Sequence, residues 1–85
     1  MSTPYRNINL VIADDHEIFR DGLKLMLSKT QGIALVGEAS NGADLVNLVK
    51  RLQPDVVLTD IKMPIIDGVE ATRQIVAHFP EIGVI

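Results

Sequence analysis

Short apolar runs alternate with segments of helical period along this chain of 85 residues. The apolar runs are typical of strands, and the segments between them carry apolar residues three or four positions apart, as amphipathic helices do. The predicted strands are 8–13, 33–39, 55–59 and 82–85, and the predicted helices are 16–28, 43–52 and 69–78. Strands that alternate with helices predict a parallel sheet with right-handed crossovers, so we expect a doubly wound α/β fold.

Composition indicates one small globular domain. Apolar residues make up 47% of the chain and charged residues 22%, a balance that argues against disorder. The absence of cysteine excludes a disulfide framework and a thiolate metal site. The net charge of −3 gives no electrostatic case for binding nucleic acid or an anionic membrane. Because no apolar run approaches membrane-spanning length and the amino terminus lacks a signal-peptide core, we expect a soluble cytoplasmic protein with no membrane partner.

Three carboxylates are predicted to meet at one edge of the sheet. Asp14 and Asp15 follow the first strand, and Asp60 follows the third. In a doubly wound sheet these two strands are commonly neighbours, and ligands bind beyond their carboxyl ends. Two unit charges about 4 Å apart repel by roughly 4 kcal/mol at an effective dielectric constant of about 20. We therefore expect a divalent cation among the three acids, and oxygen ligands favour Mg²⁺ or Mn²⁺ over Zn²⁺.

Asp60 is the candidate acceptor of a phosphoryl group. It ends an apolar, β-branched strand and is followed by a loop with Pro64 and Gly68, which is how open parallel sheets present reactive groups. The cation would neutralise charge on the incoming phosphoryl group while Asp60 attacks phosphorus in line. The backbone carbonyl of Lys62, two residues after Asp60, is a further candidate ligand of the same ion.

Each acid also has a structural explanation. An Asp pair before a helix is often only a cap, and a single Asp after a strand is often a turn residue. Finding both at the ends of adjacent strands favours the functional interpretation. Asp55 lies at the opposite edge of the sheet, and Asp67 before Gly68 is expected to cap a helix. His16 and His78 are expected at helix ends, and neither is predicted to bind a metal.

The sequence resembles the receiver domain of two-component response regulators from about residue 8 to residue 85. The segments that carry the resemblance are 11–16, 19–23, 36–42, 54–64 and 67–72. The amino-acid sequence of these segments is most similar to that of the LuxR/NarL-type subfamily, in which the receiver precedes a helix-turn-helix output domain. The resemblance implies a flavodoxin/CheY-like receiver fold and a role in transcription regulation.

The resemblance also implies roles for individual residues. Asp60 would take its phosphoryl group from the phosphohistidine of a sensor histidine kinase. Asp15 would ligate Mg²⁺ directly, and Asp14 would hold it chiefly through water. Asp60 and the Lys62 carbonyl would complete the protein ligands.

Two residues of the family pattern are expected beyond this sequence. Family members place a Ser or Thr at the end of the fourth strand and a Lys at the end of the fifth, and residue 85 precedes both positions. We therefore expect residues 1–85 to be a receiver fragment truncated at strand four, with DNA bound only through an absent C-terminal domain. A fragment with an uncovered sheet face and an unpaired edge is expected to form a homodimer or to exchange elements with another copy.

Two other functions compete with this one. A receiver-like interaction module that is never phosphorylated is the stronger alternative, although the intact set of acids argues against it. A phosphatase of the haloacid-dehalogenase type also uses an Asp at a strand end with Mg²⁺, but it normally has a second acid where this chain has Lys62. We therefore expect a self-phosphorylating acceptor that does not turn over as an enzyme.

Overall fold

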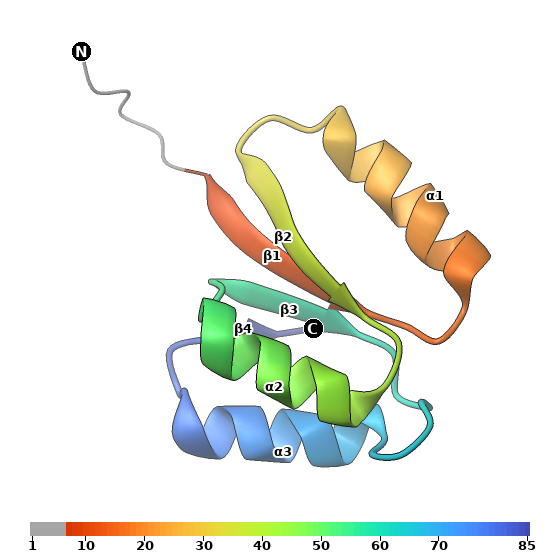
Figure 1. Cartoon of the computed structure of the whole chain (residues 1–85). Coiled ribbons are helices and arrows are strands. Elements are labelled where there is room, and N and C mark those ends of the chain that lie inside the picture. The colour runs from red at the N-terminus through yellow and green to blue at the C-terminus, as the bar shows by residue number, and fades with distance from the viewer. Residues whose placement is uncertain (1–6) are drawn as a thin grey trace.

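A computed structural model describes residues 7–85, so residues 1–6 of the predicted domain lie outside the described part. The elements follow in the predicted order: β1 (Ile8–Ala13), α1 (Glu17–Ser28), β2 (Ile33–Ala39), α2 (Gly42–Leu52), β3 (Val56–Thr59), α3 (Gly68–His78) and β4 (Gly83–Val84) (Figure 1). β4 is shorter than predicted. Ile82 donates its backbone N–H back to Phe79 and so belongs to the turn after α3. The pairing with β3 nevertheless continues through Ile85, whose N–H donates to the Val57 carbonyl.

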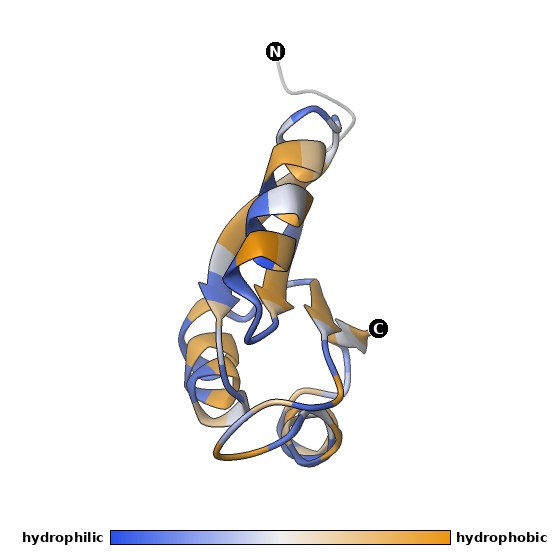
Figure 2. Ribbon diagram, turned by 90° about the vertical axis from the view of Figure 1, so that its right-hand side faces the viewer, coloured by the Kyte–Doolittle hydropathy of each residue, from blue (hydrophilic) through white to orange (hydrophobic). Residues whose placement is uncertain are grey.

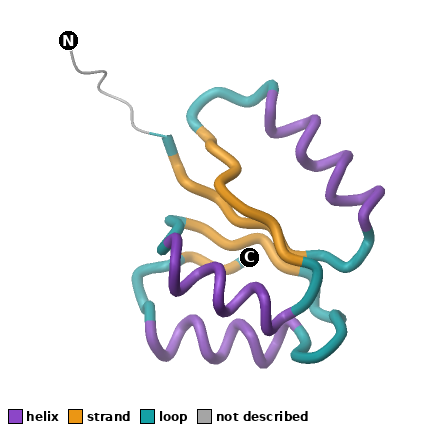
Figure 3. Tube along the Cα trace, viewed as in Figure 1, coloured by secondary structure: helices purple, strands orange, loops and turns teal. Residues whose placement is uncertain are grey.

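The four strands form one parallel sheet in the order β2-β1-β3-β4. β1 and β3 are neighbours, as the doubly wound pattern predicts, and the order reverses beside β1. All strands point the same way, so the loops that follow β1 and β3 leave the sheet at the same edge (Figure 3). The prediction of a doubly wound parallel sheet is therefore confirmed.

The residues just before each helix set where it begins. α1 begins one residue later than predicted, because His16 has extended dihedral angles (φ −101°, ψ 103°) and precedes the helix. α2 and α3 begin one residue earlier than predicted. The side chains of Asn41 and Asp67 cap these two helices by accepting hydrogen bonds from the backbone N–H groups of Asp44 and Glu70.

The helices cover the two faces of the sheet unequally. α2 and α3 lie together on one side, and α1 lies on the other (Figure 1). The core fills the α2/α3 side, with residues such as Val11, Leu45, Val57 and Ile75. None of the residues of α1, all of which the structure describes, is buried. Figure 2 shows apolar positions along α1, and Phe19 of this helix is 56% exposed.

No helix within residues 7–85 combines the length and the apolar character needed to cross a bilayer.

Close backbone approaches at two glycines fix the loop between β3 and α3. A Cβ atom added to Gly68 would lie 1.9 Å from the carbonyl oxygen of Asp60, and one added to Gly42 would lie 1.9 Å from that of Ile66. Gly68 also donates its N–H to the Ile61 carbonyl at 2.6 Å. The loop that follows Asp60 therefore packs directly on the first turns of α3 and α2, with no room for a side chain between them.

We expect Gly68→Ala to destabilise the fold by about 1–3 kcal/mol, because the added methyl group overlaps backbone that cannot move independently of β3. Gly22→Ala is the matched control. A Cβ atom there meets nothing within 4 Å, and Ala favours the helix interior by about 0.5–1 kcal/mol over Gly. Urea denaturation measures both changes, and equal effects at the two positions would show that the backbone at Gly68 has room for a side chain.

Candidate functional site

The register between β1 and β3 places Asp14 and Asp60 side by side. Ala13 pairs with Thr59 at the last position of both strands. Asp60 then donates its N–H to the Ala13 carbonyl at 2.9 Å, and Asp14 donates its N–H to the Ala39 carbonyl at 3.0 Å. The backbone at both acids is therefore held by the sheet, just beyond the strand ends.

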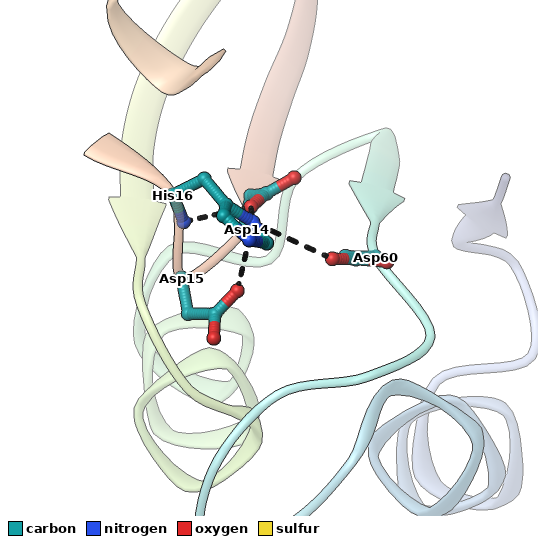
Figure 4. A group of neighbouring side chains, drawn as sticks. All are labelled: Asp14, Asp15, His16 and Asp60. Carbon is teal, nitrogen blue, oxygen red and sulfur yellow. Dashed lines mark hydrogen bonds and ion pairs between the residues drawn. The ribbon is translucent and has the colours of Figure 1, made fainter. Parts of the chain in front are cut away.

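Four side chains gather at this edge: Asp14, Asp15, His16 and Asp60 (Figure 4). Each offers one ligand atom, and these atoms all lie within 4.8 Å of one another. Asp14 is buried, with 7% of its surface exposed. The side chains of Asp15 and Asp60 are 36% and 33% exposed, so both are accessible from solvent. The structure thus brings together all three acids that the sequence singled out.

His16 lies among the acids, although the sequence did not predict it there. Its Nδ1 atom lies 2.7 Å from Asp14 Oδ1, 3.0 Å from Asp15 Oδ1 and 4.0 Å from Asp60 Oδ2 (Figure 4). The hydrogen bond with Asp14, followed by the charge of Asp15, raises the pKa of His16 above its ordinary value of 6.5. The only signal in the sequence was a histidine directly after two acids, which does not reveal where its ring points.

Asp14 has a structural role as well as a place in the cluster. Its Oδ1 atom accepts the backbone N–H of His16 at 2.8 Å, so it bridges the turn before α1. The guanidinium of Arg20 donates to the backbone carbonyl of Asp14 and also bonds the Glu38 carboxylate on β2 at 3.1 Å. Arg20 therefore supports the backbone beneath the cluster, and sequence reasoning assigned it no such role.

Asp60 directs its two carboxylate oxygens differently. Oδ1 accepts the backbone N–H of Ile61 at 2.7 Å, and Oδ2 faces the imidazole of His16. The buried side chain of Met63 anchors the loop that follows to the core. Lys62 lies exposed between these residues. A role for its carbonyl as a ligand stays a prediction.

The other candidates have structural roles, as the sequence analysis expected. Asp55 lies at the opposite edge of the sheet, where its carboxylate accepts the N–H of Asn9 at 2.8 Å. Asp67 caps α3. The Nδ1 atom of His78 is 2.9 Å from the Gln74 carbonyl, far along α3 from the acids.

An open hollow of about 680 Å³ lies beside the cluster, between α1 and the sheet. Its lining includes Phe19 and Leu23 of α1, Leu58 of β3, and both His16 and Asp60. The side chain of Asp60 therefore borders an apolar hollow as well as the acids, on the face of the sheet that α1 covers incompletely.

Comparison with known proteins matches residues 10–85 to the response regulator receiver domain. Response regulator GacA of Pseudomonas aeruginosa is 44% identical over 78 residues, which are 92% of this chain and 36% of GacA. The receiver domain of NarL from Mycobacterium tuberculosis superposes with a TM-score of 0.83 at 34% identity, over 93% of this chain and 62% of that one. The structure of RcsB in a complex with DNA superposes with a TM-score of 0.87 at 34% identity, over 94% of this chain and 41% of that one. The chain spans about a third of the length of the curated relatives it matches, such as the 36% of GacA.

We expect Ile65→Gly to raise the free energy of unfolding by about 1 kcal/mol. Ile65 has a φ of 72°, in a turn closed by the hydrogen bond from Ile66 N to Pro64 O at 2.9 Å. A branched residue in the left-handed region costs about 1–2 kcal/mol, which outweighs the added chain entropy of Gly. Ile61→Gly in the same loop is the control, because Ile61 is also exposed but has no positive φ. If urea denaturation shows both variants to be destabilised alike, Ile65 carries no strain.

We expect His16 to titrate above pH 6.5 in buffer that contains a metal chelator. A raised pKa means that the folded state binds the proton more tightly than the unfolded state does. The stability that this contributes is present below the unfolded-state pKa and is lost as the pH rises through the folded-state pKa. NMR titration of the ring protons measures the value, with the urea-unfolded chain as reference. A His16 pKa at or below that of the unfolded chain would contradict the geometry of the cluster.

Proposed function

The chain belongs to the response regulator receiver domain family, of the kind found in two-component regulators of the LuxR/NarL type, and on that basis we propose that Asp60 is its phosphoacceptor. The observation that carries the proposal is the position of Asp60 Oδ2. It lies at the end of a central strand, on the side of the acid cluster, while Oδ1 is already held by the Ile61 N–H. One oxygen thus fixes the carboxylate and the other is directed toward the site.

We propose a sensor histidine kinase as the phosphoryl donor. In the transfer, an oxygen of Asp60 attacks phosphorus in line, the P–N bond of the phosphohistidine breaks, and the leaving imidazole nitrogen takes up a proton. The chain accepts one phosphoryl group and does not turn over. The side chain of Asp60 is one-third exposed, which leaves it accessible to the active site of a second protein.

The donor set fits Mg²⁺. Asp14, Asp15 and Asp60 supply carboxylate oxygens, and the Lys62 carbonyl is the fourth proposed protein ligand. Two ligands on opposite sides of one Mg²⁺ lie about 4.2 Å apart. The ligand atoms of the three acids lie within 4.8 Å of one another, so only a small closure of the side chains is required. When bound, the ion supplies positive charge against the phosphoryl oxygens.

We also propose that phosphorylation of Asp60 controls transcription. DegU of Brevibacillus brevis, 41% identical over 92% of this chain, is named a transcriptional regulatory protein, and RcsB has been solved on DNA. The net charge of −3 gives residues 1–85 no electrostatic means of holding DNA. In this proposal these residues form the receiver, and contact with DNA is made by another part of the protein.

A receiver-like module that only binds a partner protein is the second candidate. The apolar surface of α1 favours it, since Ile18 is 89% exposed and Met26 is 64% exposed. Exposed apolar residues that gather on one element often mark a protein interface. Phosphorylation distinguishes the two candidates, because only the phosphoacceptor needs a nucleophile at position 60.

We expect Asp60→Asn to abolish Mg²⁺-dependent labelling by radioactive acetyl phosphate, because an amide oxygen does not displace phosphate. Asp67→Asn is the matched control: it makes the same change in the same loop, and Asn retains the cap of α3. The wild-type chain and the control should incorporate label, and a chelator should prevent it. Equal labelling of Asp60→Asn and the wild type would overturn the assignment of Asp60 as the phosphoacceptor. The absence of labelling in the wild type as well as in Asp60→Asn would favour the interaction module.

A further inference from the structure

His16 has no part in the proposed transfer, yet its ring lies where the acids converge. Its Nδ1 atom is closer to Asp14 Oδ1 (2.7 Å) and Asp15 Oδ1 (3.0 Å) than any ordinary van der Waals contact allows. Its distance from Asp60 Oδ2 is 4.0 Å. The three carboxylates come from two different strand ends, and this single nitrogen atom faces all of them (Figure 4).

The backbone directs the ring into this position. His16 is held in an extended conformation before α1, and its N–H donates to Asp14 Oδ1 at 2.8 Å. Its carbonyl accepts the N–H of Arg20 at 3.0 Å, which is the first hydrogen bond of the helix. Both sides of the residue are therefore tied, and the imidazole extends from a fixed point over the acids even though 69% of its side chain is exposed.

A hydrogen bond explains only part of this arrangement. Nδ1 carries at most one hydrogen, and that hydrogen can point well at one acceptor only. The contact with Asp14 satisfies it. The second carboxylate at 3.0 Å and the third at 4.0 Å then face a nitrogen with no further proton to give.

The same distances suit a shared metal ion. Around an ion with six ligands at about 2.1 Å, neighbouring ligand atoms lie about 3.0 Å apart and opposite ones about 4.2 Å apart. The distances from Nδ1 to Asp14 and Asp15 match neighbouring positions, and its distance to Asp60 matches an opposite position. The nitrogen is therefore spaced from the oxygens as one ligand is spaced from the others.

We propose that His16 is a metal ligand through Nδ1, and that it gives this site a selectivity for ions that favour imidazole, such as Co²⁺, over Mg²⁺. The inference rests on the proposed function for the presence of a divalent cation. Carboxylates and carbonyls suit Mg²⁺, whereas an imidazole nitrogen adds affinity for the later transition metals. The acids bind either ion, and His16 changes the ratio of the two affinities.

The test is the ratio of Co²⁺ to Mg²⁺ affinity, measured by calorimetric titration of the wild-type chain, His16→Asn and His78→Asn. Asn keeps a polar residue with good capping properties before α1 but removes the ring nitrogen. We expect His16→Asn to lower the ratio of Co²⁺ to Mg²⁺ affinity about tenfold or more. Mutation of a residue that only hydrogen-bonds a metal ligand already lowers metal affinity by about that much. His78→Asn, which removes the other histidine of the described residues, should leave the ratio unchanged.

A second measurement needs no substitution at the site. In the NMR spectrum of the wild-type chain, Co²⁺ should displace the ring signals of His16 strongly and those of His78 little. The inference is overturned if both ions bind but His16→Asn retains the wild-type ratio, or if the His16 ring signals stay unmoved; His16 would then be only a counter-ion of the acids. If neither ion binds the wild-type chain, both the proposed Mg²⁺ site and the proposed role of His16 as a metal ligand are wrong.

Discussion

The parallel pairing of β1 with β3 is the constraint on which the site depends. Both strands end at the same level, at Ala13 and Thr59, so the next residue of each chain segment leaves the sheet at one edge. A shift of the register by one residue would turn Asp60 to the other face of the sheet. Val11 and Val57 form part of the buried core, and such a shift would expose them, so the packing of the core fixes the position of the carboxylate.

Most of the fold could be predicted because it follows from local patterns. The order of elements and the neighbouring position of the first and third strands required only hydrophobic period and the rules for parallel sheets. The degree of burial on each helix was harder to predict. The helical period places Leu52 on the same face of α2 as the buried residues Leu45 and Val49. Leu52 is nevertheless 37% exposed, because it lies in the last turn of the helix. Helical period identifies a face, but it does not show how far the neighbouring layer extends over it.

The candidate site was predictable at the acids and not at the residues around them. A carboxylate at a strand end is placed by the backbone, so its location follows from topology. The position of the His16 ring depends on its side-chain torsion angles and on the extended backbone conformation of the residue just before α1. Arg20 reaches the Asp14 carbonyl from the first turn of α1. Both contacts depend on how α1 sits against the sheet, and no pattern in a single sequence specifies that angle.

The two halves of the site consequently have different mechanical support. Asp60 follows β3, which is paired on both sides, and its loop is held by the close approach of Gly68 and the buried side chain of Met63. Asp15 and His16 lead into α1, which buries none of its residues and is tied to β2 by ion pairs to Glu38. Such exposed pairs are each worth about 0–1 kcal/mol, far less than a packed helix face contributes. A cation bound by both halves would therefore stabilise mainly α1, because this helix has the weakest packing of its own.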